Sequence, residues 1–330
     1  MDTDMNLSRR NFITNLLKMG AGAIVASTLG LLAACTRNKE NLSTIKEPVS
    51  TTRTLPLPSP ANKPYIAVAS GEDVDVNVRT AITILGGMGR FVKNGNDVII
   101  KPNICNASNS WEYASTTNPQ VVASLVTLCF EAGAARVRVM DQPFAGTSEM
   151  GYERSGISEM VQASGGEMEI MSPMKFRDFE ISEGIDIKKW PVYTDCLETD
   201  VLINVPIAKH HALARLTLGM KNLMGIIDNR TQFHFNLGQR IADLTSLVQP
   251  QLTVIDAIRI LKNHGPTGGD LADVEQTNTI IASHDMVAAD SFATRLFGLT
   301  PNDIPALRSA EKMRLGVTDL NTVEVQEISV

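Results

Sequence analysis

The sequence predicts an α/β domain over residues 65–330, with a mostly parallel sheet, helices on both faces and therefore three layers. Two observations predict this fold. From Tyr65 onward, short apolar runs alternate with longer segments of helical period, and no internal repeat is present. Strands that alternate with helices form crossover units, which favour a parallel sheet covered on both faces.

The elements alternate along most of the domain. The predicted strands are Tyr65–Ala69, Asp97–Lys101, Arg136–Asp141, Met168–Met171, Val201–Pro206, Leu252–Asp256 and Thr279–Ala282. The predicted helices are Val76–Lys93, Asn118–Ala132, Ser155–Ser164, Leu216–Ile226, Leu237–Val248, Met286–Leu296 and Ile304–Arg314. Because crossover connections are right-handed, we expect every strand to end at one edge of the sheet, where ligands bind in open α/β sheets.

Residues 1–34 have the pattern of a twin-arginine signal peptide. The segment Ser8–Ile13 contains Arg9-Arg10 followed by Asn, Phe and Ile, and an uncharged run follows over Met19–Ala34. That run is shorter than the roughly 20 apolar residues that a membrane span needs. It ends in Ala-Ala before Cys35, which resembles a lipobox. We therefore expect the export machinery to deliver the chain as a lipoprotein, anchored through Cys35 on the periplasmic or cell-surface side; an uncleaved membrane anchor is the alternative.

The segment 35–64 is predicted to be a disordered tether. It is rich in Thr, Ser, Asn, Lys and Pro, so it cannot bury enough apolar surface to offset the entropy of ordering. The whole chain has 43% hydrophobic residues, which suits a globular body, and a net charge of −6. An acidic balance disfavours a nucleic-acid binder, which needs a basic face.

The cysteines argue against an intrinsic iron–sulfur cluster. With Cys35 expected to carry lipid, Cys105, Cys129 and Cys196 remain, and no CxxC spacing is present. A self-contained cluster needs closely spaced thiolates. Cys129 lies in an apolar helical pattern and is expected in the core, whereas Cys105 follows a strand and is a candidate site residue.

Polar side chains stand where several predicted strands end. Lys101 and Asn103 follow one strand and Asp141 another, Lys209 and His210 follow a third, and Asp256 a fourth. Ser283-His284-Asp285 follows the last predicted strand. If all these strands end at one edge, the residues form a polar site there.

A second cluster lies in the stretch Met220–Gly225. Lys221 and Asn222 interrupt an apolar segment, and a buried Lys or Asn is costly without partners. Arg230 follows shortly after, so Lys101, Lys209, Lys221 and Arg230 could converge on a phosphate or carboxylate. A metal site is the alternative because all five histidines fall between His210 and His284, although no HxH, HxxxH or HExxH spacing is present. Gly-x-Ser-x-Gly is also absent, which disfavours a serine hydrolase.

Several segments resemble one known family. They are Ile99–Asn103, Thr117–Val122, Glu131–Ala134, Lys209–His211, Thr217–Gly225, His234, Ile241–Leu244 and Leu252–Ala257. In this order they resemble the family called domain of unknown function 362 over roughly residues 65–315. The resemblance implies no established activity. Many relatives carry ferredoxin-type CxxCxxC segments, which this chain lacks, so a ferredoxin function is not implied here.

The leading functional prediction is an enzyme that binds a small anionic substrate or cofactor at the sheet edge. The predicted ligand-binding residues are Lys101, Asn103, Asn118, Asp141, Lys209, Lys221, Asn222 and Arg230. His210 or His234 would handle protons, because imidazole titrates near neutral pH. Asp141, Asp256 or Asp285 would orient a histidine or a metal, and His210, His234 and Asp256 are the predicted catalytic residues. The alternative is a non-catalytic redox accessory lipoprotein that binds a cofactor or a partner. Substrate, reaction and any metal stay open.

Overall fold

The computed structural model describes residues 65–330. The predicted signal peptide, the predicted lipidation site Cys35 and the predicted tether lie outside the described residues. Between Tyr65 and Val330, none of the helices combines the length and the apolar composition that a membrane-crossing segment needs.

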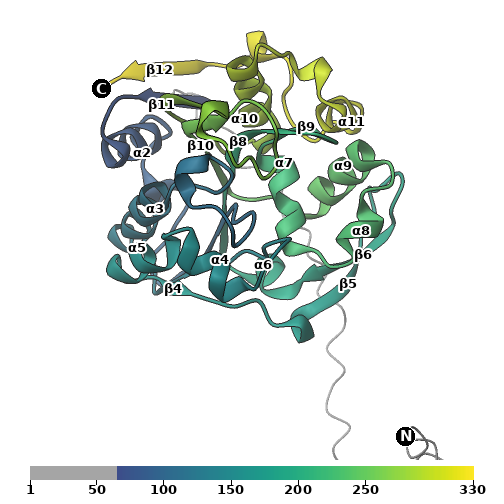
Figure 1. Cartoon of the computed structure of the whole chain (residues 1–330), viewed down its shortest axis with the longest axis horizontal. Coiled ribbons are helices and arrows are strands. Elements are labelled where there is room, and N and C mark those ends of the chain that lie inside the picture. Colours follow the sequence, from purple (N-terminus) through teal and green to yellow (C-terminus); the bar gives the residue numbers. More distant parts are fainter. Residues whose placement is uncertain (1–64) are drawn as a thin grey trace, which may run out of the picture. The chain divides into compact units, whose positions relative to one another are not determined.

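The fold is built on a mixed, mostly parallel sheet of 10 strands (Figure 1). Its main path is β12 (Val325–Ser329), β1 (Ile66–Ser70), β11 (Val274–Ser283), β10 (Leu252–Leu261), β7 (Val201–Val205), β2 (Asp97–Pro102), β3 (Arg136–Val139) and β4 (Glu167–Met168). Off this path, β8 (Ile207–His211) pairs with β10 and with β9 (Arg215–Thr217), and β5 (Phe176–Glu180) and β6 (Lys189–Tyr193) form a separate hairpin.

Helices cover both faces of the sheet, as predicted. They are α2 (Val74–Ile84), α3 (Pro119–Glu131), α4 (Ser148–Arg154), α5 (Ile157–Ala163), α6 (Thr194–Glu198), α7 (Gly219–Asn222), α8 (Arg230–Phe233), α9 (Leu237–Leu247), α10 (Met286–Ala293) and α11 (Pro305–Met313). Consecutive side chains of a strand point to opposite faces. Val98 and Ile100 accordingly join a core with α2, α3 and α5, and Ile99 joins a core with α7, α9, α10 and α11.

These two cores explain why the apolar runs were recognisable as strands. Ile99, Ile100 and Leu202 have no exposed surface, as expected for central strands sandwiched between helices. Each such aliphatic side chain contributes roughly 1.5–3 kcal/mol through burial. The α/β fold class with three layers is therefore confirmed.

The expectation that every strand ends at one edge is wrong for β11. This strand pairs antiparallel with both β1 and β10, because it returns beside β10 as the second arm of a long hairpin. Its end, Ser283–Asp285, thus lies at the opposite edge from the ends of β2, β3 and β10. There Asp285 caps α10 by accepting a hydrogen bond from the Ala288 amide, and His284 packs against Tyr65.

The predicted helix Leu216–Ile226 is also wrong in part. Its first residues belong to β9, and a short helix, α7, begins only at Gly219, before a 3₁₀ turn over Leu223–Ile226. Leu218 is extended, and the Asp290 carboxylate accepts hydrogen bonds from the amides of Gly219 and Met220 at 2.6 and 2.8 Å. A buried acid on α10 therefore fixes where α7 begins. The predicted helix Val76–Lys93 likewise ends early, at Ile84, before two glycines with positive φ.

Candidate functional site

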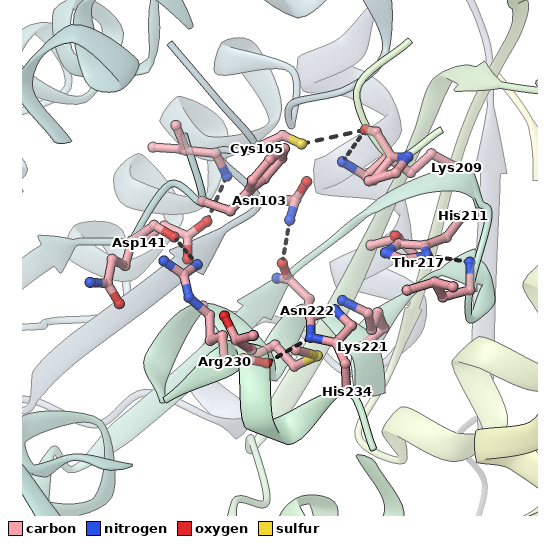
Figure 2. A pocket seen from close by; sticks show the side chains of 18 of the residues that line it. Asn103, Cys105, Asp141, Lys209, His211, Thr217, Lys221, Asn222, Arg230 and His234 are labelled. Carbon is pink, nitrogen blue, oxygen red and sulfur yellow. Dashed lines mark hydrogen bonds between the residues drawn. The ribbon is translucent and has the colours of Figure 1, made fainter. Parts of the chain in front are cut away.

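A cavity of about 780 Å³ opens at the carboxyl ends of β2, β3 and β8 (Figure 2). The polar and sulfur-bearing side chains that line it are Asn103, Cys105, Asp141, Gln142, Lys209, His211, Thr217, Lys221, Asn222, Met224, Asp228, Asn229, Arg230, Thr231 and His234. They come from the strand ends, from α7 and from α8. The cavity therefore lies at the edge where parallel α/β sheets bind ligands.

A buried ion pair between Lys101 and Asp141 forms the base of this region. A lysine ammonium has three N–H donors, and Lys101 uses them on the Pro102 carbonyl at 2.8 Å, Asp141 Oδ1 at 2.7 Å and Asn222 Oδ1 at 3.1 Å. The second carboxylate oxygen of Asp141 accepts the Ile104 amide at 2.6 Å. Burial lowers the pKa of Lys101, and the Asp141 carboxylate opposes that shift. Lys101 thus holds neighbouring groups in place and has no donor left for a ligand.

Asn222 connects this ion pair to the neighbouring strands. Its Oδ1 also accepts from Asn103 Nδ2 at 2.9 Å, and its Nδ2 donates to Asn204 Oδ1 at 2.8 Å. The buried asparagine of the Met220–Gly225 stretch therefore has the partners that its burial requires. It joins α7 to β2 and β7.

Gly225 has no side chain because the ion pair lies directly against it. A Cβ at this position would overlap Asp141 Oδ1 and would lie 2.6 Å from Lys101 Nζ. Real Cβ atoms do not approach other atoms so closely, so any larger residue would displace the pair. The motif Lys221-Asn222-Leu223-Met224-Gly225 is thereby explained at two of its positions, Asn222 and Gly225.

Three further cations surround the cavity with unused donors. Lys209 donates to the carbonyls of Ser115 at 2.6 Å and Pro266 at 3.0 Å, which leaves its third N–H beside the sulfur of Cys105, a weak acceptor that a ligand could replace. Arg230 donates to the carbonyls of Gln142 at 2.8 Å and Pro143 at 2.9 Å, which leaves part of its guanidinium unbonded. Within residues 65–330, the Lys221 ammonium has neither a hydrogen bond nor an ion pair, although its side chain is mostly buried.

The electrostatic environment makes Lys221 unusual. Burial lowers its pKa to about 7, and Lys209, Arg230 and Lys101 push in the same direction. Burial also lowers the pKa of Lys209 and of Arg230. Of the two acids in the lining, Asp141 is neutralised by Lys101 and Asp228 is exposed. The cavity therefore carries an excess of positive charge.

Three oxygen atoms at the cavity have no partner. Thr217 Oγ1, Asn103 Oδ1 and Gln142 Oε1 are buried, and none of them forms a hydrogen bond within the described part of the chain. All three residues line the cavity, so a ligand with a hydroxyl or amino group could bond to them.

His211 lines the cavity and was missed by the sequence analysis. Lys209 and His211 share one face of β8, whereas His210 faces the other way, where its Nδ1 accepts the Gly265 amide at 3.1 Å. Nδ1 of His211 accepts the amides of Leu213 and Ala214 at 3.1 and 3.2 Å, so the proton of the neutral ring is assigned to Nε2. Burial, together with Lys221 and Lys209, lowers the pKa of His211 to about 3. The strand alternation Lys209–His211 was the signal that could have identified it.

The structure brings most of the predicted residues together but places three elsewhere. Asn103, Asp141, Lys209, Lys221, Asn222, Arg230 and His234 line the cavity, and Lys101 lies beneath it. His210, Asn118 and Asp256 do not line it.

Asn118 and Asp256 have structural contacts instead. Asn118 caps α3, and its amide donates to Asp256 Oδ2 at 2.7 Å, while the Ile258 amide donates to Oδ1 at 3.0 Å. Burial raises the pKa of Asp256 to about 6. His234 is exposed at the cavity mouth, with Nδ1 2.6 Å from the Arg230 carbonyl.

The donor set does not favour a metal in the described residues. Among residues 65–330, no three side chains of His, Cys, Asp or Glu gather in a way that would hold an ion. Cys105 forms part of the cavity wall, with Sγ 3.4 Å from the Pro266 carbonyl that also accepts from Lys209. The cavity offers ammonium, guanidinium and imidazole groups, which suit an anion.

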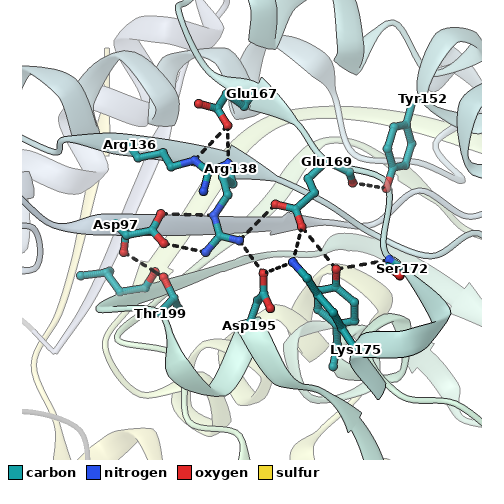
Figure 3. A network of polar contacts seen from close by, with 12 residues as sticks. Asp97, Arg136, Arg138, Tyr152, Glu167, Glu169, Ser172, Lys175, Asp195 and Thr199 are labelled. Carbon is teal, nitrogen blue, oxygen red and sulfur yellow. Dashed lines mark hydrogen bonds and ion pairs between the residues drawn. The ribbon is translucent and has the colours of Figure 1, made fainter. Parts of the chain in front are cut away.

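A second charged cluster surrounds Arg138 on β3 (Figure 3). Its guanidinium contacts Asp97 at 2.6 Å, Asp195 at 2.7 Å and Glu169 at 3.1 Å. Lys175 also contacts Asp195 and Glu169, at 2.8 and 3.2 Å. Because each charge has an opposite partner, this cluster joins β2, β3 and α6 and does not offer an unpaired group to a ligand.

Known proteins resemble this chain to different degrees. The thylakoid-associated protein sll1697 of Synechocystis is 28% identical over 252 residues, which cover 73% of this chain and 75% of that protein. Two solved structures align with a TM-score of 0.44 and 11% identity: a Thermotoga maritima protein, over 68% of this chain and 59% of that one, and the lactate racemase apoprotein of Thermoanaerobacterium thermosaccharolyticum, over 70% and 56%.

The chain thus spans less than two thirds of either solved structure, and a likeness of this degree assigns neither substrate nor reaction. A family model, described as domain of unknown function (DUF362), matches residues 98–295, which is more than half of the chain. The chain therefore belongs to the DUF362 family.

Proposed function

We propose that this protein is an enzyme that binds a small anion, a carboxylate or a phosphate, in the cavity at the sheet edge. The observation that carries the proposal is Lys221, a mostly buried lysine without a counter-ion beside two other cations. Charged groups that are buried without partners are costly, and they occur mainly where function requires them.

The remaining donors suit an anion in both number and kind. The unused N–H groups of Lys209, Lys221 and Arg230 come from three different elements around one space. Ammonium and guanidinium groups form strong, charge-assisted hydrogen bonds with carboxylate and phosphate oxygens. The volume of about 780 Å³ lies within the range of roughly 300–1,000 Å³ that is usual for small-molecule sites.

Groups suited to acid–base chemistry support an enzyme over a plain binding protein. Lys221 has a pKa of about 7, so both its charged and its neutral form are accessible near neutral pH. His211 is neutral and has an Nε2–H available at the cavity, and His234 stands at the mouth. A site that only holds an anion would need neither the two histidines nor a lysine whose pKa is brought close to neutral pH.

Isothermal titration calorimetry with inorganic phosphate and with pyruvate tests the proposal. We expect at least one of the two to bind the full-length protein. Lys221→Met should weaken that binding roughly 10- to 100-fold, because hydrogen bonds to charged groups contribute about 1.5–3 kcal/mol. Lys312→Met is the matched control, since Lys312 is exposed on α11 outside the cavity. Equal affinity in the two variants would contradict the assignment of Lys221.

We also propose that the protein is exported and held at a membrane by lipid on Cys35. The support comes from Arg9-Arg10, the following apolar run and the Ala-Ala before Cys35. The Synechocystis relative is named as thylakoid-associated, which agrees with a location at a membrane.

Fractionation of the native host tests this location. Replacing Arg9 and Arg10 with lysine should retain the chain in the cytoplasm. Cys35→Ala should abolish labelling by radioactive palmitate. Unchanged export and labelling in these variants would contradict the proposal.

A further inference from the structure

We infer that Lys221 is a nucleophile that forms an imine with the carbonyl group of a small 2-oxo acid. The inference rests on the proposed function, because it takes the anion of the cavity to be the carboxylate of such a substrate. It goes further by assigning a covalent role to one amine and a substrate class to the site.

The three buried lysines of this region differ in their bonding. Lys101 donates to three acceptors and Lys209 to two, so the nitrogen atoms of both are held in place. Lys221 has none within residues 65–330, although it lines the same cavity. A lysine that only stabilises the fold would be expected to have acceptors, as the other two do. The nitrogen atom of Lys221 is instead left available for a reaction.

The surroundings also favour the neutral amine, which is the nucleophilic form. The charged and titratable groups around Lys221 are Lys209 and His211 of β8, Arg230 of α8 with His234 directly after it and Asp228 shortly before it, Lys101, Asp141 and Cys105 at the ends of β2 and β3, and Asp290 of α10. Asp141 is paired with Lys101, Asp290 is bonded to two backbone amides, and Asp228 is exposed.

Burial and the neighbouring cations therefore outweigh Cys105, which acts in the opposite direction, and bring the pKa of Lys221 to about 7. About half of the side chains are then neutral at pH 7, whereas an ordinary lysine with a pKa near 10.4 is almost entirely charged. Desolvation and neighbouring cations activate lysines for Schiff-base chemistry in this way.

The other donors can hold the substrate while the amine reacts. Lys209 and Arg230 retain donors for the carboxylate. The Nε2–H of His211 can donate to the carbonyl oxygen and polarise the carbonyl group. In a 2-oxo acid the carbonyl carbon is bonded directly to the carboxylate. Binding of the carboxylate would therefore hold the carbonyl carbon inside the cavity that Lys221 lines.

The reaction balances without an added oxidant or reductant. The Lys221 nitrogen bonds to the carbonyl carbon as the carbonyl π bond breaks, and one proton moves from nitrogen to oxygen to give a carbinolamine. His234, which reaches solvent, supplies a second proton to that oxygen. The oxygen then leaves as water, and the nitrogen keeps its last proton in an iminium ion.

Reductive trapping tests the inference on the full-length protein. Pyruvate, glyoxylate or 2-oxoglutarate is added with sodium cyanoborohydride, and the adduct is measured by intact-protein mass spectrometry and located by peptide mapping. We expect a single adduct on Lys221 with at least one probe, faster labelling as the pH rises to 7 and a plateau above it. Inorganic phosphate should protect Lys221 if it occupies the same cavity.

Two variants and a parallel binding measurement make the outcome decisive. The Lys221 adduct should be lost in Lys221→Arg, which keeps the charge and the length, and retained in Lys312→Met. Binding of a 2-oxo acid by calorimetry without an adduct on Lys221 overturns this inference and leaves the proposed anion site intact. Labelling spread evenly over exposed lysines also overturns it. Absence of any anion binding overturns the proposed function itself.

Discussion

Gly225→Ala should destabilise the protein strongly, because Gly225 lies against the buried pair Lys101–Asp141. The added Cβ would overlap Asp141 Oδ1 and lie 2.6 Å from Lys101 Nζ. Neither group can move away freely. Lys101 is held by three acceptors, and Asp141 also accepts the Ile104 amide at 2.6 Å.

The expected magnitude follows from separating that ion pair. Breaking a buried pair costs about 3–5 kcal/mol, since it leaves a buried charge without compensation. In a domain of this size, each kcal/mol shifts Tm by roughly 2–4 °C, so we expect a decrease of about 6–20 °C. Thermal unfolding followed by circular dichroism measures it.

Gly89→Ala is the matched control. A Cβ at Gly89 would meet no atom within 4 Å, so the Tm of that variant should stay close to the wild-type value. If Gly225→Ala is no less stable than Gly89→Ala, the close packing of Gly225 on the ion pair is refuted.

Three further variants test other parts of the structure. Lys221→Met should stabilise the ligand-free protein at pH 6 by roughly 1–3 kcal/mol, because it removes a charge that burial disfavours. Each unit by which burial lowers the pKa corresponds to about 1.4 kcal/mol, and partial exposure of the side chain reduces the total. The pKa of Lys221 is lowered to about 7, so between pH 7 and 10 only the unfolded chain keeps the proton on this lysine. The stability of the wild-type protein should therefore rise over this pH range, and urea titrations of Lys221→Met should lack this rise. Arg138→Met should cost about 3–5 kcal/mol at pH 7. Burial raises the pKa of Glu169 and Asp195, but hydrogen bonds from Arg138 and Lys175 hold both pKa values below their usual range. The difference in unfolding free energy between Arg138→Met and wild type should therefore shrink as the pH falls below about 4 and these acids take up protons. A difference that stays constant with pH would refute this coupling. Asp256→Asn should keep anion affinity within about twofold in calorimetry because Asp256 lies outside the cavity, and a large loss would restore its predicted functional role.

The sequence predicted the central layers because their signals are local. Strands such as β2 and β7 are buried on both faces and therefore read as short apolar runs. The strands β5 and β12 were missed since they are partly exposed and rich in polar residues. The direction of β11 could not be read from its own residues, because it depends on the hairpin that β11 forms with β10.

The site was predicted in part for a similar reason. The cost of burying a lysine and an asparagine in an apolar segment identified Lys221 and Asn222, and the structure supplies the partners of Asn222 and the cavity next to Lys221. The sequence does not single out His211, because Lys209–His211 follows the predicted strand Val201–Pro206 and shows no strand pattern of its own. In the structure these residues belong to β8, whose alternation separates His211 from His210.

Asp256 also follows an apolar run, but its strand continues to Leu261, so its carboxylate bonds to backbone amides inside the fold. A polar residue that follows an apolar run therefore indicates the end of the sheet at which the site lies. It does not show which of the side chains there face the cavity.

Proton uptake on anion binding tests whether the anion binds beside a partly neutral Lys221. Calorimetric titrations at pH 8 in two buffers of different ionisation enthalpy measure how many protons the complex takes up. A bound anion should raise the pKa of Lys221 from about 7, so the wild-type protein should take up a substantial fraction of one proton and Lys221→Met should take up much less. Equal uptake in both proteins, or no binding of phosphate or pyruvate by either, would contradict the account.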